Sequence, residues 1–124
     1  MPKILVIDDN SAQRETIQDA LRSNGFETIE AENGTAGVEM ARTHLPDLIL
    51  CDVNMAQGDG YATLALLRNE PVTANIPFIL MSGYSNEAGM RRGMQEGADD
   101  YLTKPFTMDA LFTAVKAQIK SRRS

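Results

Sequence analysis

Leu48-Ile49-Leu50-Cys51-Asp52 is the stretch that decides the fold of this 124-residue chain. Four apolar residues follow one another without polar alternation, which is typical of a strand buried on both faces of a parallel sheet. The run ends at a carboxylate, Asp52. In an open α/β sheet, ligands bind in the crevice at the carboxyl ends of the strands. The sequence therefore predicts that Asp52 lies where this chain does its chemistry.

The pattern of a strand followed by a helix recurs along the whole chain. Apolar and β-branched runs predict strands at residues 3–7, 26–31, 48–51, 77–81 and 99–103. Apolar residues at helical spacing predict a helix after each strand, and the predicted N-caps of the last four helices are Thr35, Asp59, Ser85 and Thr107. Because right-handed crossovers lay each helix over the sheet, this alternation predicts a parallel sheet with helices on both faces.

The predicted fold is one α/β domain over residues 1–124, a doubly wound five-stranded parallel sheet of the flavodoxin-like (βα)5 type with strand order 2-1-3-4-5. In that order the first and third strands are neighbours, about 4.8 Å apart. Asp8 and Asp9 directly follow the first strand, so they would meet Asp52 at one edge. Carboxylates this close repel unless a cation is bound or one is protonated. Oxygen ligands that leave room for water and a phosphate favour Mg²⁺ over Ca²⁺ or zinc.

Two further polar groups are expected at the same edge, the Ser82 hydroxyl after the fourth strand and the Lys104 ammonium after the fifth. Acids, a metal, a hydroxyl and a lysine together describe a pocket for a phosphoryl group, and an Asp carboxylate is an established nucleophile for phosphoryl transfer. We interpret Asp52 as the nucleophile because it is central. Asp8 and Asp9 share one loop and are better suited to hold the metal.

Composition excludes several classes of protein. Hydrophobic residues make up 43% and charged residues 23% of the chain, as in an ordinary globular domain, and the net charge of −5 argues against a nucleic-acid surface. The single cysteine, Cys51, cannot form an internal disulfide and is expected to be buried and inert. No apolar segment approaches the length of a membrane span and no signal peptide is recognised, so we expect a cytoplasmic protein without membrane association.

Motifs at four strand ends resemble those of the receiver domain of bacterial two-component response regulators, of the single-domain, chemotaxis-regulator-like type. They are Asp8-Asp9-Asn10, Asp52-Val53-Asn54-Met55, Ser82-Gly83 and Lys104-Pro105-Phe106. Each motif alone is common, but the four in this order and on these elements make the resemblance specific, and it covers essentially all 124 residues. One departure is Ala56, which stands where the family pattern usually has Pro.

The resemblance implies a phosphorylation-dependent switch of a two-component phosphorelay rather than an enzyme, with self-catalysed phosphotransfer and autodephosphorylation as its only chemistry. Asp52 would accept a phosphoryl group from a sensor histidine kinase or a histidine phosphotransfer protein. Mg²⁺, for which Mn²⁺ can substitute, would be bound by Asp8, Asp9, Asp52 and the backbone carbonyl of Asn54.

The resemblance also assigns residues to a conformational switch. Ser82 matches the hydroxyl residue that follows the phosphoryl group on activation, and Lys104 matches its ion-pair partner. Tyr101 matches the aromatic residue that turns inward when the hydroxyl moves, although ordinary core packing is the alternative interpretation of this tyrosine. Output would pass to a downstream protein target or to an output domain of the same chain.

The helix expected after Ser85, the fifth strand and the last helix form a predicted partner surface, which could also support a dimer. Met90 and Met94 lie on that helix, and methionine surfaces repack readily around different partners, whereas core filling is the simpler interpretation. Gly89 and Gly93 each cost about 1 kcal/mol relative to Ala inside a helix, so we expect this helix to be the most mobile one.

Two other functions suit the same fold less well. A metal-dependent phosphatase with an aspartyl nucleophile would require a second Asp as acid and base two residues later, where this chain has Asn54. A flavodoxin-like FMN protein would require a Ser/Thr/Gly-rich phosphate loop after the first strand, where Asp8, Asp9 and Asn10 stand instead. The sequence therefore favours the phosphorylation switch.

Overall fold

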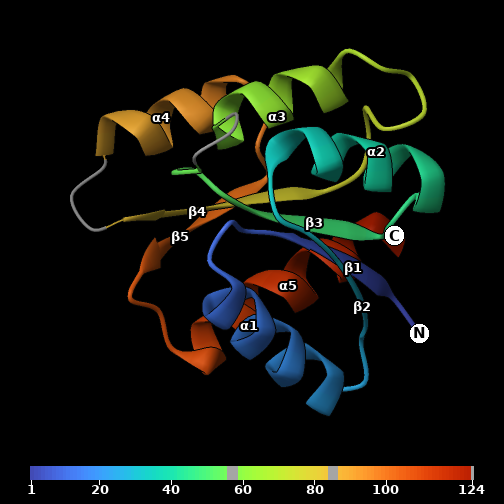
Figure 1. Cartoon of the computed structure of the whole chain (residues 1–124), viewed down its shortest axis with the longest axis vertical. Coiled ribbons are helices and arrows are strands. Elements are labelled where there is room, and N and C mark those ends of the chain that lie inside the picture. The colour runs from blue at the N-terminus through green and yellow to red at the C-terminus, as the bar shows by residue number, and fades with distance from the viewer. Residues whose placement is uncertain (56–58, 84–86, 124) are drawn as a thin grey trace.

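Five parallel strands form the central sheet of the computed structural model, which describes residues 1–55, 59–83 and 87–123 (Figure 1). The strands are hydrogen-bonded in the order β2-β1-β3-β4-β5, which confirms the predicted topology. Their bounds are β1 Lys3–Ile7, β2 Glu27–Ala31, β3 Leu48–Asp52, β4 Phe78–Gly83 and β5 Asp100–Lys104. Asp52, Ser82 and Lys104, which were expected just after their strands, are thus part of the strands. Ala56 and the predicted N-cap Ser85 lie outside the described residues.

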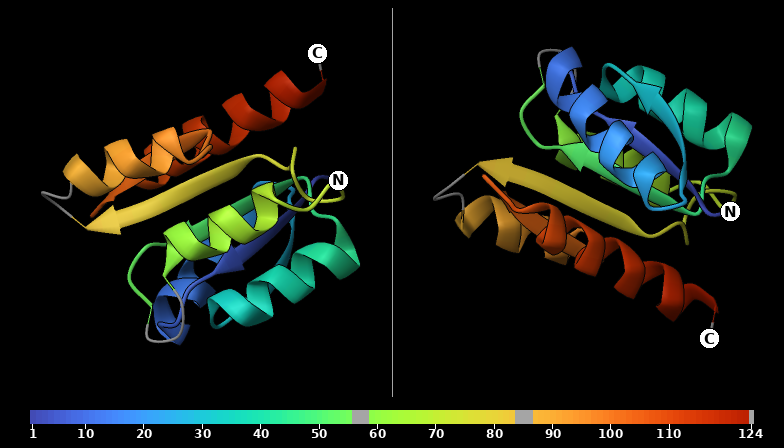
Figure 2. Two further views of the ribbon diagram at one scale, coloured as in Figure 1. Left: turned by 90° about the horizontal axis from the view of Figure 1, so that it is seen from above. Right: turned by 90° about the horizontal axis from the view of Figure 1, so that it is seen from below.

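Helices cover both faces of the sheet, so the fold has three layers. Their bounds are α1 Ser11–Ser23, α2 Gly34–His44, α3 Gly60–Arg68, α4 Glu87–Gln95 and α5 Met108–Arg123. Figure 2 shows α2, α3 and α4 over the sheet from one side, and α1 and α5 over it from the other. Among the described helices, none has the length and apolar character that crossing a bilayer requires.

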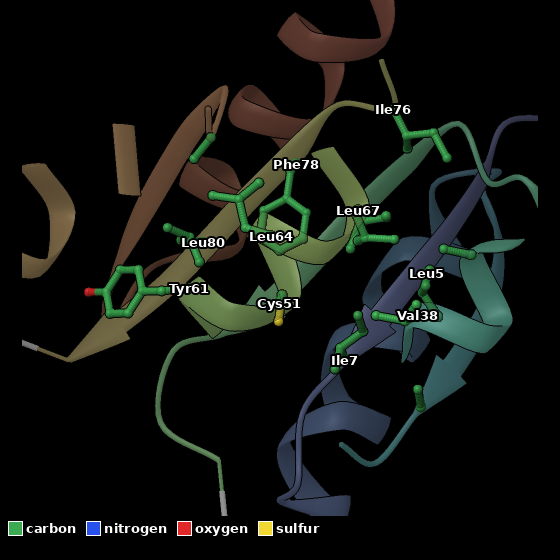
Figure 3. Close-up of a cluster of buried hydrophobic side chains, with 14 of the residues drawn as sticks. Leu5, Ile7, Val38, Cys51, Tyr61, Leu64, Leu67, Ile76, Phe78 and Leu80 are labelled. Atoms are coloured by element: carbon green, nitrogen blue, oxygen red, sulfur yellow. The ribbon is translucent and has the colours of Figure 1, made fainter. Parts of the chain in front are cut away.

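Two apolar clusters join the sheet to its helix layers. The cluster under α2 and α3 includes Leu5, Cys51, Leu64 and Phe78 (Figure 3), and the one under α1 and α5 includes residues from all of β1, β3 and β4. Every residue of β3 is buried, as its unbroken apolar run predicts. Cys51 is fully buried, and burial raises the pKa of its thiol well above the ordinary value, which confirms the expectation of a buried cysteine.

The N-caps of three helices can be compared with the sequence prediction. The Asp59 side chain accepts the Ala62 N–H, and the Thr107 hydroxyl accepts the Ala110 N–H, so these two caps are confirmed. The prediction of Thr35 as the cap of α2 is wrong. Asn33 caps this helix, because its backbone is extended and its side chain accepts the Ala36 N–H at 2.8 Å. Thr35 lies within the first helical turn instead.

Arg68, the last residue of α3, joins the amino-terminal ends of β4 and β5. Its guanidinium donates to the carbonyls of Ala74 at 3.1 Å and Ile76 at 2.7 Å, in the segment before β4. It also donates to the Gly97 carbonyl and to the Asp99 carboxylate, in the segment before β5. One side chain therefore holds α3 and two connecting segments together at the edge of the sheet opposite Asp52.

Gly93 allows α4 to approach the sheet closely. A Cβ at this position would lie 2.2 Å from Cδ1 of Leu80 on β4, and Leu80 is itself buried. The glycine that the sequence marks as a weak point of the helix thus has a packing role. The expectation that α4 is the most mobile helix stays a prediction.

The strand registers align the carboxyl ends of β1, β3, β4 and β5. Ile7 pairs with Cys51, so that Asp8 and Asp52 occupy the next positions of neighbouring strands. Asp52 pairs with Met81, and Gly83 pairs with Lys104. This alignment assembles the polar edge described next.

Candidate functional site

Three carboxylates meet at the carboxyl end of the sheet, as the predicted strand order requires. One carboxylate oxygen from each of Asp8, Asp9 and Asp52 lies within 4.8 Å of the other two. Asp8 and Asp52 are buried, whereas Asp9 is exposed. Three acidic groups at this separation repel one another strongly unless a positive charge lies among them.

The environment of Asp8 fits a bound divalent cation. Its Oδ1 accepts the Asn10 N–H at 2.9 Å, but its Oδ2 is buried and has no hydrogen-bond partner among the described residues. Burial raises the pKa of Asp8, the Asn10 hydrogen bond opposes that shift, and the charge of Asp52 adds to it. A buried carboxylate oxygen without a hydrogen bond requires an explanation, and a hard cation shared with Asp9 and Asp52 supplies one. The donor set, made of oxygen atoms only, suits Mg²⁺.

Lys104 brings a positive charge to the same edge. Its Nζ lies 2.9 Å from Oδ1 of Asp52, and both side chains are largely buried. Lys104 stands at the end of β5 and Asp52 at the end of β3, so the lysine side chain reaches across the end of β4 to make this ion pair. The structure therefore brings Asp8, Asp9, Asp52 and Lys104 together.

Ser82 and Tyr101 lie on the two strands beyond β3, but in different surroundings. Ser82 is buried near the end of β4, one position after the partner of Asp52 in the neighbouring strand. Tyr101 is 40% exposed, so ordinary core packing, the alternative interpretation, is wrong for this side chain. It lines a hollow of about 280 Å³ on the surface of α4 and β5, together with Glu87, Met90, Arg91 and Met94. Met94 is 43% exposed, which rules out core filling for that residue as well.

The segment after Asp52 packs tightly against the start of α3. Asn54 is exposed there, and the Gly60 N–H donates to the carbonyl of Val53 at 3.0 Å. A Cβ on Gly60 would lie 2.7 Å from the backbone carbonyl oxygen of Asp52, so only glycine permits this approach. The sequence prediction missed Gly60, although Asp59-Gly60 at the start of a helix was the available signal.

Arg14 on α1 is a second residue that the sequence prediction missed. Its Nη1 donates to the backbone carbonyl oxygen of Asp8 at 2.7 Å, behind the acidic side chains. Its position in the middle of a polar helix face gave no sign of this contact, because the contact depends on how α1 lies against the end of β1.

The fold and this edge of the sheet define a receiver domain: the chain belongs to the response regulator receiver domain family, whose model matches residues 4–116. The chain is 36% identical over 118 residues to the phosphate regulon transcriptional regulatory protein PhoB of Escherichia coli (strain K12), a match that covers 95% of this chain and 52% of PhoB. It is 35% identical over 119 residues to the sensor histidine kinase CheAY of Helicobacter pylori, covering 94% of this chain and 15% of that protein. A response regulator receiver domain protein from Clostridium thermocellum is similar with a TM-score of 0.93 and 28% identity, over 99% of this chain and 98% of that one.

Family membership fixes the general role of the chain. Receiver domains are signalling switches that accept a phosphoryl group on an aspartate, and they are not classical enzymes. They generally bind Mg²⁺ through an acidic pocket, and they interact with histidine kinases or phosphotransfer proteins and with output domains. The chain spans about half the length of the PhoB proteins and of the other transcriptional regulators that it resembles.

Proposed function

We propose that this domain accepts a phosphoryl group on Asp52 from a histidine kinase or a histidine phosphotransfer protein, and that phosphorylation changes its α4-β5-α5 surface. The strongest support is the ion pair of 2.9 Å between Lys104 and the buried Asp52, inside a cluster of three acids. In the phosphotransfer step, a carboxylate oxygen of Asp52 bonds to phosphorus while the P–N bond of the donor phosphohistidine breaks. The electron pair of that bond stays on the imidazole nitrogen.

Asp52 is the best nucleophile of the three acids for geometric reasons. The carboxylate of Asp8 is more deeply buried, and its Oδ1 is engaged by the Asn10 N–H. Asp9 is exposed to solvent. Asp52 lies between Asp8 and Lys104 at the central strand, where an attacking oxygen and a neutralising ammonium are already close together.

The remaining acids form the proposed metal site. Asp8, Asp9, Asp52 and the backbone carbonyl of Asn54 would hold Mg²⁺, or Mn²⁺ in its place, and the buried Oδ2 of Asp8 supports this assignment. When bound, the cation would supply positive charge to the oxygens of the transferred phosphoryl group. Asp8 and Asp9 would act on these oxygens only through the cation that they hold, because their own charges repel a phosphoryl group.

The proposed switch starts at Lys104 and Ser82. A phosphoryl group on Asp52 adds up to two negative charges, so Lys104 exchanges its bond to the Asp52 carboxylate for one to a phosphoryl oxygen. Ser82 donates its hydroxyl to another phosphoryl oxygen, and Tyr101 turns inward from its exposed position. The hollow between α4 and Tyr101 would then change shape, and with it the surface offered to an output partner or to a second copy.

A groove beside Lys104 is the proposed docking site of the phosphodonor protein. It has a volume of about 440 Å³ and lies between α1 and the segment that joins β5 to α5. Its lining is mostly apolar, with Ile17, Pro105, Phe106 and Met108 among the residues, and it includes Lys104. We also propose that residues 1–124 form one receiver domain. We expect this domain to act in the cytoplasm, where ATP is available to a sensor kinase, and not to bind nucleic acid or membranes directly.

The test uses a small phosphodonor in place of the kinase. The chain is incubated with acetyl phosphate or phosphoramidate and MgCl₂, and the intact mass is measured. We expect one phosphoryl adduct that EDTA prevents and that Asp52→Asn abolishes. Asp19→Asn is the matched control, since Asp19 is an exposed acid on α1, and this variant should be phosphorylated normally. An adduct of unchanged yield in Asp52→Asn would refute the assignment.

A further inference from the structure

We propose that Arg14 is a positioning residue that fixes the backbone of the Asp8–Asp9 segment and thereby sets the affinity of the acidic site for Mg²⁺. This inference rests on the proposed function, because it assumes that the three acids hold a divalent cation. It adds a residue that does not itself belong to the acidic cluster.

The contacts of Arg14 join three elements at the rear of the site. From α1, its Nη1 donates to the backbone carbonyl oxygen of Asp8 at 2.7 Å, and its Nε donates to Oε1 of Glu30 on β2 at 2.8 Å. The Arg14 side chain is only 13% exposed. One planar group therefore bridges the end of β1 to β2, and its two hydrogen bonds point in directions fixed by the guanidinium.

Glu30 is held in place from a second direction. Gln18 of α1 donates to its Oε2 at 3.0 Å, so each oxygen of the carboxylate has its own donor. The hydrogen bonds from Gln18 and Arg14 lower the pKa of Glu30, which keeps it charged at neutral pH. Arg14 is thus anchored on a half-exposed carboxylate that two side chains hold, and this restricts the direction of the Nη1 hydrogen bond.

The carbonyl that Arg14 contacts lies just beyond the end of the sheet ladder. The register of β1 and β2 ends with Ile7 opposite Ala31, and Asp8 follows with its N–H donating to the Ala31 carbonyl at 3.1 Å. The Asp8 carbonyl belongs to the peptide unit that leads to Asp9. Arg14 therefore fixes the peptide plane between the two acids that the proposed function assigns to the metal.

Fixing this peptide plane matters because Mg²⁺ requires nearly ideal octahedral geometry. Removing groups that orient metal ligands typically weakens metal binding by about 10- to 100-fold. The charge of Arg14 has the opposite effect, because a positive guanidinium repels a cation. A role through charge alone predicts tighter Mg²⁺ binding when Arg14 is removed, whereas a positioning role predicts weaker binding.

The experiment measures the Kd for Mg²⁺ of the full chain by isothermal titration calorimetry, without any phosphodonor. Arg14→Gln should raise the Kd by about 10- to 100-fold, and Arg14→Lys, which keeps the charge but offers one ammonium in place of the fork, should recover only part of the affinity. Glu30→Ala keeps Arg14 but removes its anchor, and should raise the Kd by a smaller factor. Arg42→Gln is the matched control, since Arg42 lies on α2 and bonds to Glu39 and Glu70, away from the contacts of Arg14, and its Kd should equal that of the wild type.

The possible outcomes separate this inference from the proposed function. Unchanged or tighter binding in Arg14→Gln, with normal binding by the wild type, would overturn the positioning role and leave the metal site intact. Absence of Mg²⁺ binding by the wild type would overturn both. If Arg14→Gln fails to fold, Arg14→Lys decides the question, because it keeps the positive charge, and both a role through charge alone and a purely structural role leave the Kd of the folded variant unchanged.

Discussion

Replacing Asp8 by Asn should stabilise the metal-free protein, although the change removes a residue of the proposed metal site. Asp8 is buried, and its carboxylate lies within 4.8 Å of those of Asp9 and Asp52. At an effective dielectric constant of about 20, two unit charges at such a separation repel by about 3 kcal/mol. Attraction to Lys104 offsets part of this repulsion. We therefore expect the free energy of unfolding to rise by about 1 to 2 kcal/mol.

The stabilisation expected from Asp8→Asn should vary with pH in a defined direction. Burial raises the pKa of Asp8 above its ordinary value of 3.8, so the native state binds this proton more tightly than the unfolded state does. The loss of stability caused by the charged Asp8 carboxylate is absent at a pH below its ordinary pKa. This loss grows as the pH rises towards the raised pKa of the native state, and it is complete above that pKa. The stability difference between Asp8→Asn and the wild type should therefore be largest at neutral pH and disappear in acid.

The assay is urea unfolding followed by far-UV circular dichroism, in EDTA and in MgCl₂. Mg²⁺ at a hundred times its Kd should stabilise the wild type by about 2.7 kcal/mol and Asp8→Asn by much less. Asp19→Asn makes the same change in net charge at an exposed position, and it should change stability by less than about 0.5 kcal/mol. A loss of stability in Asp8→Asn in EDTA, or an equal gain in Asp19→Asn, would refute the electrostatic reasoning.

Three further predictions test the packing and charge of the fold, the first two by the same unfolding assay and the third by calorimetry. Gly60→Ala should lower the free energy of unfolding by about 1 to 3 kcal/mol, because its Cβ would lie 2.7 Å from the Asp52 carbonyl oxygen. Gly83→Ala, with open space around the new Cβ, should leave it nearly unchanged. Equal effects of the two substitutions would contradict this explanation. Arg68→Met should lower the free energy of unfolding by about 2 to 4 kcal/mol, because it leaves the partly buried carbonyls of Ala74 and Ile76 without donors. A loss below about 0.5 kcal/mol would show that water replaces the guanidinium. Lys104→Met removes a positive charge 2.9 Å from Asp52, so calorimetry should find tighter Mg²⁺ binding, and weaker binding would argue against an electrostatic role for the lysine.

The fold and the acidic cluster were predictable because both follow from rules that act along the chain. Runs such as residues 48–51 have no polar alternation, and this pattern separates a buried parallel strand from a half-exposed one. Once the strand order is known, the positions of Asp8 and Asp52 at the ends of neighbouring strands follow from the register alone. No knowledge of side-chain packing is needed for that step.

The features that the sequence did not predict depend on how elements approach one another. Asn33 and Thr35 are both good capping residues, and only the backbone conformation selects Asn33. In the sequence, Gly93 indicates only a weak point in a helix, and its packing role is evident only from the position of Leu80 against it. Arg14 reads as a surface residue, because its bond to the Asp8 carbonyl arises from the docking of α1.

The ion pair between Asp52 and Lys104 joins residues that are 52 positions apart in the chain. During synthesis on the ribosome, at about 5 to 20 residues per second, Asp8, Asp9 and Asp52 emerge several seconds before this lysine. Until β5 adds to the edge of the nascent sheet, the carboxylates lack the ammonium that lies beside Asp52 in the finished domain. Under the proposed function, competence for phosphorylation is therefore acquired late, and a truncated chain that ends before residue 104 should not accept a phosphoryl group.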